Sequence, residues 1–363
     1  DLKTDTVARL GGDEFAILLP ETNLEQAKVS TRKVLEDLKH AYIVEGHTLN
    51  VNISMGLAEF PTHGDDVNIL MQRADVAMYQ AKQNKLGYTV YDPNKDIHSV
   101  GRLALMSELR EAIENELLEV YFQPQINIET DEVIGAEALL RWNHPQRGFI
   151  QPDEFIPLAE QTGLIKPLTR WVLKKSIIQC SEWRKSNIEL VMSINLSVHN
   201  IHDSNLILYI HNLLCDHDLP PEYITLEVTE GDVMSEPIRA KETLKKIKHT
   251  GINISIDDFG TGYSSLSYIK QLPINEIKID RSFVMEMVED VDDDIIVNAT
   301  IYLAHNLGLK IVAEGVHNRQ TLARLKELNC DTAQGHYISE PLTANEFTAW
   351  IKAKSWKQKL KSV

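Results

Sequence analysis

The chain has 363 residues, which fits two domains, one of them large enough to be an α/β barrel. Its 43% hydrophobic and 25% charged residues are ordinary for a globular protein, and no apolar run approaches the length of a membrane span. A net charge of −16 argues against a nucleic-acid polymer as partner, although bound divalent cations would still permit a phosphate substrate. The widely spaced cysteines lack metal-ligand spacing and fit free thiols, so we expect a cytoplasmic protein without membrane contact in this segment.

Residues 1–92 have the element pattern of half a domain. The chain begins at Asp1, close to an expected strand, which indicates a piece of a longer protein. Apolar runs at 6–10 and 15–19 flank a glycine pair, a pattern that predicts a strand–turn–strand hairpin. Helical periodicity covers 24–38 and 69–81, and further strands are expected at 49–57 and 88–91.

The turn of this hairpin carries the sequence Gly11-Gly12-Asp13-Glu14-Phe15, and matching blocks follow it in order. On these motifs the segment resembles GGDEF domains, the diguanylate cyclases. The resemblance implies that Asp13 or Glu14 helps to hold a metal and that Lys82 contacts phosphate. The family's first half is missing, and Leu2 stands where an inhibitory-site arginine is common. We therefore expect a regulatory or dimerising remnant that cannot cyclise nucleotide.

Residues 93–107 are expected to form a helical linker after Pro93. Apolar residues at three- and four-residue spacing predict a helix over 97–116: Leu103, Met106, Leu109, Ile113 and Leu117. A helical connection would be semi-rigid, so the two domains are expected to be mechanically coupled.

From residue 108 to 352, short β-rich runs alternate with helical ones, and residues 353–363 are left as a C-terminal tail. This alternation favours a (β/α)₈ barrel that follows the partial α+β domain. Strands expected at 120–126 and 133–142 are close enough for a hairpin, so one barrel strand should be antiparallel. In this fold, catalytic side chains lie at the C-terminal ends of the strands.

Seven of the expected strands have a polar residue near their C-terminal end: Glu137, Asn195, Glu227, the pair Asp257-Asp258, Lys278, Glu314 and Gln334. Acidic residues are depleted in strands and are rarely buried without partners. Carboxylates gathered at one rim would repel each other unless cations joined them. Oxygen ligands without Cys or His suit Mg²⁺ or Mn²⁺.

The pair Asp257-Asp258 is informative because neighbouring residues on a regular strand point to opposite faces. Both can reach metal only where the strand breaks, and Gly260 and Gly262 are expected to supply that break. One aspartate bridging two cations would make a two-metal site, which suits in-line attack on a phosphoester. Lys278 would then contact the attacking water or a phosphate oxygen, and Glu314 could accept a proton.

The run Glu137-Ala138-Leu139, followed by Leu140-Arg141-Trp142, resembles the signature of EAL domains, the phosphodiesterases of cyclic di-GMP. Further blocks match in order across residues 108–352. The resemblance implies metal-dependent hydrolysis of cyclic di-GMP to linear pGpG. It also implies a set of metal ligands: Glu137, Asn195, Glu227, Asp257 and Asp258.

Other roles are implied by the same resemblance. Glu137, Lys278 and Glu314 would be catalytic, and substrate would meet Gln123 at a guanine edge, Arg141 at a phosphate oxygen, and Asp280 and Gln334. Glu230 would tether the loop 259–265, which in this family links metal binding to dimerisation. A homodimer through the EAL domain is therefore expected.

Two positions depart from the family pattern, where His317 replaces a usual acid and His336 a usual aromatic residue. Neither is a typical metal ligand in this family, so activity is expected to survive. One alternative is a catalytically silent cyclic di-GMP receptor, although such domains usually lose several of the acids that this chain keeps. The other is a bifunctional cyclase and phosphodiesterase in a full-length parent.

Overall fold

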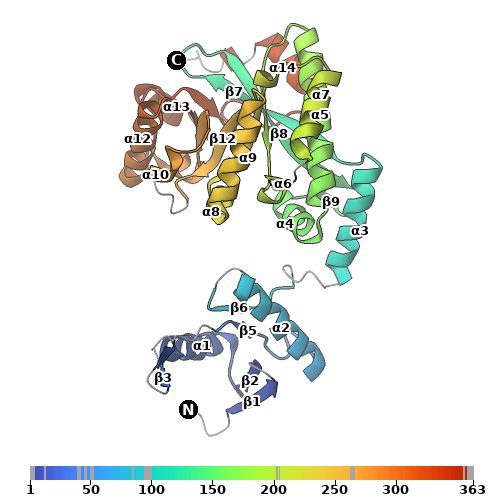
Figure 1. The fold of residues 1–363 in the computed structure, drawn as a ribbon, viewed down its shortest axis with the longest axis vertical. Coiled ribbons are helices and arrows are strands. Elements are labelled where there is room, and N and C mark those ends of the chain that lie inside the picture. Colours follow the sequence, from blue (N-terminus) through green and yellow to red (C-terminus); the bar gives the residue numbers. More distant parts are fainter. Residues whose placement is uncertain are drawn as a thin grey trace. The chain divides into compact units, whose positions relative to one another are not determined.

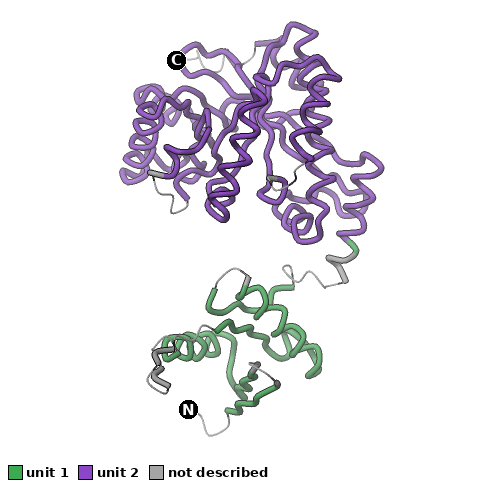
Figure 2. Tube along the Cα trace, in the orientation of Figure 1, with its two compact units in different colours: residues 1–104 green, residues 105–363 purple. Residues whose placement is uncertain are grey.

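The computed structural model describes residues 5–11, 14–38, 42–44, 47–49, 53–83, 86–93, 100–201, 203, 205–261, 266–354 and 356–357. The chain divides into two compact units, residues 1–104 and 105–363 (Figure 2). The finer domain boundaries stay predictions. Among the described residues, no helix combines the length and apolarity that a membrane span requires.

Unit 1 contains the predicted hairpin, in which β1 (Thr6–Gly11) pairs antiparallel with β2 (Glu14–Leu18). Its other elements are α1 (Leu24–Leu38), the short hairpin β3 (Tyr42–Val44) and β4 (His47–Leu49), and β5 (Met55–Leu57), α2 (Val67–Gln83) and β6 (Tyr88–Val90). The strand predicted over 49–57 is confirmed at its end, where β5 pairs in parallel with β6. A Cβ on Gly56 would lie 1.9 Å from the Ala74 carbonyl oxygen, so only glycine lets β5 approach α2 this closely.

Unit 2 is the predicted barrel, preceded by α3 (Val100–Glu114), which lies within the expected helix. Its eight barrel strands are β7 (Glu119–Asn127), β8 (Val133–His144), β10 (Val191–Asn195), β11 (Ile224–Thr229), β12 (Asn253–Phe259), β13 (Glu276–Ile279), β14 (Lys310–Ala313) and β15 (Thr332–Gln334). The pairing of β8 with β10 closes the ring. β7 runs antiparallel to both its neighbours, β8 and β15, which confirms the expected antiparallel strand.

The helices surround the strands (Figure 1). They are α4 (Pro152–Thr162), α5 (Ile165–Lys185), α6 (Val198–Ile201), α7 (Leu206–Asp216), η1 (Pro221–Tyr223), α8 (Glu230–Ser235), α9 (Pro237–His249), α10 (Leu266–Ile269), α11 (Arg281–Glu286), α12 (Val291–Asn306), α13 (Arg319–Glu327) and α14 (Ala344–Ala353); β9 (Gly148–Ile150) pairs with the end of β8. Side chains cap the N-termini of several helices. Asp290 is the N-cap of α12, Asn318 is the N-cap of α13, and Thr343 forms a capping box with Glu346 on α14.

The barrel strands alternate between apolar and polar residues, although both kinds are buried. On β12, Ile254 and Ile256 belong to the hydrophobic core, whereas Ser255 and Asp257 alternate with them. Asp257 contacts Lys278 of the next strand, so this polar face lies inside the barrel. The barrel interior is therefore polar, and it positions the residues predicted at the strand ends.

Candidate functional site

The centre of the site is Lys278 on β13, whose side chain is fully buried. Its Nζ lies close to four carboxylates from four different strands: 2.6 Å from Glu314, 2.9 Å from Glu227, 3.2 Å from Asp257 and 3.4 Å from Glu137. Glu137 lies within β8 and not near its C-terminal end as predicted, because this strand continues to His144. The structure thus brings together residues separated by up to 177 positions in the sequence, from Glu137 to Glu314. We call these five residues the carboxylate–lysine cage.

Amide side chains complete one side of the cage around Glu137. Asn195 Nδ2 donates to Glu137 Oε1 at 2.8 Å, and Gln334 Nε2 donates to Glu137 Oε2 at 2.6 Å. Gln334 Nε2 also donates to Gln123 Oε1 at 3.0 Å. The strand-end amides and Gln123, all predicted from the sequence, therefore share one hydrogen-bonded network with the cage.

Gln125 belongs to this network and was missed in the sequence. Its Nε2 donates to Gln334 Oε1 at 2.9 Å, and its side chain is buried. It lies opposite Gly135 in the register of β7 and β8, where a Cβ would come within 2.7 Å of Gln125 Oε1. A signal was available, because Gln123 and Gln125 are two residues apart on one strand and so share a face.

Burial and mutual charge shape the ionisation of the cage. Burial raises the pKa of Glu227 well above its ordinary value and that of Glu314 to about 8, in each case against the opposing pull of the Lys278 charge. Burial alone would lower the pKa of the Lys278 ammonium, but the four carboxylates outweigh it and hold that pKa well above its usual range. One ammonium therefore does not offset four ionised acids, and Glu227 and Glu314 are shifted toward their protonated forms.

Glu137 differs from Glu227 and Glu314. Burial again works against its charged form, but the Lys278 charge and the hydrogen bonds from Gln334 and Asn195 outweigh it, so the pKa of Glu137 is lowered. Of these three glutamates, Glu137 is therefore the one best prepared to stay ionised.

Three carboxylates have the spacing that a metal ion requires. Oxygens of Asp257, Asp258 and Glu314 lie within 4.8 Å of one another. Glu227 Oε1 is buried without a hydrogen-bond partner among the described residues, so this oxygen is available to coordinate a ligand. A set of carboxylate oxygens that includes an unsatisfied buried one fits a hard divalent cation.

The turn that lets Asp257 and Asp258 act together begins earlier than predicted. The register between β12 and β13 shifts between Ile256 and Phe259, and Asp258 itself has a φ of 53°. The strand is therefore already irregular at Asp258, and it ends at Phe259, directly before Gly260 with its φ of 104°, as predicted for that glycine; Gly262 lies outside the described residues. An aspartate tolerates this left-handed backbone better than most residues. Burial, and then the neighbouring charges of Asp257 and Asp280, raise the pKa of Asp258 to about 6.

Comparison with known proteins identifies this arrangement. The family model described as the EAL domain matches residues 106–341. The chain belongs to the EAL domain family. A second family model, described as the diguanylate cyclase GGDEF domain, matches residues 2–87, so a partial GGDEF domain precedes the EAL domain.

The chain is also similar to individual proteins of this tandem arrangement. It is 39% identical over 349 residues to the bifunctional diguanylate cyclase/cyclic di-GMP phosphodiesterase MucR of Pseudomonas aeruginosa, covering 96% of this chain and 51% of MucR. It is 38% identical over 348 residues to the signaling protein YkoW of Bacillus subtilis, covering 95% of this chain and 44% of YkoW. The chain thus spans about half the length of the curated relatives it matches.

Among solved structures, the chain is similar to the phosphodiesterase PaMucR in complex with c-di-GMP. The two share 41% identity with a TM-score of 0.65, covering 67% of this chain and 99% of that one. EAL domains are metal-dependent in general, which agrees with the acidic cluster.

The predicted peripheral residues of the EAL domain lie around the cage. Glu230, at the start of α8, accepts a hydrogen bond from the backbone N–H of Gly260 at 2.9 Å, which ties it to the segment after β12. The Arg141 guanidinium lies 5.9 Å from the ring centroids of both Tyr121 and Phe149. Asp280 caps α11 by accepting from the backbone N–H of Ser282 at 2.9 Å and also accepts from its hydroxyl.

The two histidines that depart from the EAL pattern are exposed, and neither belongs to the cage. His317 Nε2 lies 2.8 Å from Asn318 Nδ2. In the GGDEF segment, Asp13 and Leu2 lie outside the described residues, and of Glu14 only its position at the start of β2 is described. Lys82 is exposed in the last turn of α2.

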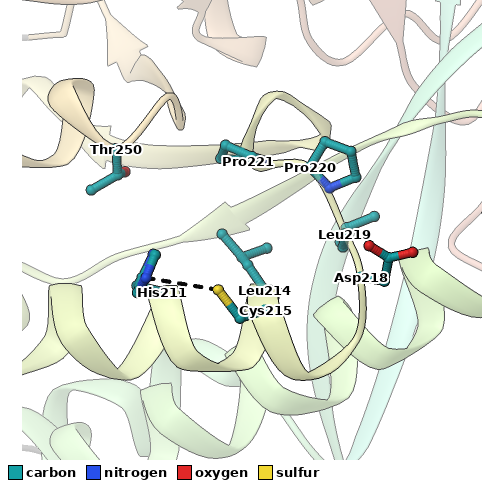
Figure 3. A pocket seen from close by; sticks show the side chains of 8 residues that line it. All are labelled: His211, Leu214, Cys215, Asp218, Leu219, Pro220, Pro221 and Thr250. Atoms are coloured by element: carbon teal, nitrogen blue, oxygen red, sulfur yellow. Dashed lines mark hydrogen bonds between the residues drawn. The ribbon is translucent and has the colours of Figure 1, made fainter.

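A cavity of about 300 Å³ lies elsewhere on the EAL domain, between the end of α7 and the start of β11 (Figure 3). In it, Cys215 Sγ lies 3.7 Å from His211 Nε2. Because this cavity adjoins the start of β11 and the cage occupies the strand ends, the cavity is separate from the candidate site.

Proposed function

We propose that the EAL domain hydrolyses cyclic di-GMP to linear pGpG with two Mg²⁺ or Mn²⁺ ions. The observation that carries the proposal is the cage itself, in which three buried carboxylates and the partly exposed Glu314, from four different strands, face a single ammonium. Buried acids in such excess either take up protons, as the raised pKa values of Glu227 and Glu314 indicate, or bind further cations. The similarity to a phosphodiesterase solved with c-di-GMP supports the substrate.

Under this proposal the metal ligands are Glu137, Asn195, Glu227, Asp257 and Asp258. Bound ions would supply an activated water and offset charge on the phosphoester. The chain's own residues would position the water and the phosphate and transfer protons. Lys278 would hold the water or a phosphate oxygen, and Glu314 would accept a proton.

Substrate would be held at the rim by Arg141 and the glutamine network. The aromatic rings of Tyr121 and Phe149 fix the Arg141 guanidinium, whose planar fork suits a phosphate oxygen pair. Gln123 and Gln334, held to each other and to Glu137, would meet a guanine edge. Asp280 completes the proposed substrate contacts.

The test is incubation of the 363-residue chain with cyclic di-GMP and Mn²⁺ or Mg²⁺, followed by chromatography. We expect pGpG to accumulate with metal and not with excess chelator. Intact cyclic di-GMP that binds but is not cleaved in either metal would instead indicate a silent receptor. No binding and no cleavage would refute the assignment of the substrate.

We also propose that the EAL domain forms homodimers in the cytoplasm and that the GGDEF segment is regulatory. Helix α12 has large apolar side chains that are strongly exposed, Val291 at 73% and Tyr302 at 72%, which supports a contact surface. Sedimentation should show a dimer. Removal of residues 1–92 should change the hydrolysis rate; an unchanged rate would argue against coupling through α3.

A further inference from the structure

The Lys278 ammonium has an unusual environment for a lysine. Its side chain is fully buried, and Glu137, Glu227, Asp257 and Glu314 all lie within ion-pair distance. Among the described residues, no other lysine, arginine or histidine forms an ion pair with these four acids. A single ammonium thus lies among four acids whose ionised forms would repel each other.

The same four carboxylates include those that would hold divalent ions. Glu314 and Asp257 lie in the cluster with metal-ligand spacing, and each also pairs with Lys278. The Lys278 ammonium and a divalent metal ion would therefore compete for the same carboxylate oxygens. When a divalent ion binds, the ammonium contributes less to offsetting the repulsion between the carboxylates, because the ion carries twice the charge of the ammonium.

We propose that Lys278 is the resident cation of the metal-free cage, and that divalent ions bind by taking carboxylates over from its ammonium. This inference rests on the metal centre of the proposed function but not on its substrate. It gives Lys278 a role in folding and metal exchange beyond contact with water or phosphate. A lysine needed only for packing would matter equally with and without metal.

The test is the melting temperature of the full chain carrying Lys278→Met, which removes the charge and keeps most of the stem. In chelator we expect the variant to melt lower by on the order of 10 °C, because removing one partner leaves buried charges unpaired. In saturating Mn²⁺ the deficit should shrink to less than half. The rise in melting temperature on adding Mn²⁺ should therefore be larger in the variant than in the parent.

The matched control is Lys310→Met, the same change at an exposed lysine at the start of β14. It should leave both melting temperatures within about 2 °C of the parent, as surface substitutions usually do. An equal deficit for Lys278→Met in chelator and in Mn²⁺ would overturn the proposal, as would no deficit in chelator. The absence of any Mn²⁺ effect on the parent would overturn the exchange.

A variant that does not fold in chelator still gives an answer. Refolding of the variant in Mn²⁺ would support the proposal. If the variant does not refold in Mn²⁺, the double variant Lys278→Met with Glu227→Gln is measured instead. Neutralising Glu227, whose Oε2 lies 2.9 Å from Lys278 Nζ, should restore part of the lost stability in chelator. No restoration would overturn the proposal. Lack of hydrolysis by the parent would sink the proposed function alone, since these measurements contain no substrate.

Discussion

Replacing Glu137 with alanine should separate catalysis from folding. The carboxylate accepts hydrogen bonds from Asn195 and Gln334 and pairs with Lys278 at 3.4 Å, the longest of the four cage contacts. Hydrogen bonds to charged groups each contribute about 1.5–3 kcal/mol. Their loss is offset because a buried charge no longer has to be desolvated and no longer repels Glu227 and Glu314.

The net cost of Glu137→Ala to stability should therefore be about 2 kcal/mol or less, or a fall of less than about 8 °C in melting temperature. Gln334 keeps its acceptor Gln123, and Lys278 keeps three carboxylates. Turnover should fall by roughly two to three orders of magnitude, because a proposed metal ligand and its charge are lost.

The assay is chromatography of pGpG formed from cyclic di-GMP in Mn²⁺, run beside calorimetry of the same preparation. Glu129→Ala, the same change at an exposed residue just after β7, is the control and should match the parent in both. Hydrolysis by Glu137→Ala within a factor of ten of the parent would refute the reasoning. A collapsed fold would show that the offset by lost repulsion was overestimated.

Three further predictions follow from the metal chemistry, the GGDEF segment and the cysteines. Ca²⁺ should permit cyclic di-GMP binding but little hydrolysis, because its longer, looser coordination mis-spaces the reacting oxygens; full activity in Ca²⁺ would contradict the mechanism. With GTP and Mg²⁺ the chain should form no cyclic di-GMP, and chromatographic detection of that product would overturn the remnant role. At pH 8 an alkylating agent should modify exposed Cys215 alone, because burial raises the pKa of Cys180 and Cys330 to about 12; mass spectrometry showing more than one adduct on the folded chain would contradict this.

The barrel was predictable because each of its strands can be recognised from a short local sequence pattern. Short apolar runs alternating with helices, and a close pair of strands at its start, were enough for the closed ring and its antiparallel strand β7. The gathering of the polar strand residues was predictable for the same reason, since parallel strands place their C-terminal ends at one rim. Glu137 is the exception in position, because it lies within β8 and not near its end. Each of these inferences needs only a pattern within a few residues.

What the sequence could not supply is the pairing among those residues. Nothing local indicates that Lys278 meets four acids at once, because those contacts depend on barrel closure and strand register. The spacing of Gln125 from Gln123 places both on one face of β7, but nothing local indicates that Gln125 pairs with Gln334, 209 positions away. The irregularity at Asp258 is not indicated locally either, because aspartate adopts a positive φ less readily than the nearby glycines.

The overall charge and the proposed substrate are reconciled at the cage. A chain with a net charge of −16 would repel a dinucleotide with two phosphates if its acids acted directly. The buried carboxylates instead face inward on a cation, and under the proposed function they would hold two more. The field that the phosphates meet would then come from those ions and from Arg141. Under the proposed function, the acids inside the barrel would thus serve to hold cations, and a polar barrel interior would be compatible with an anionic substrate.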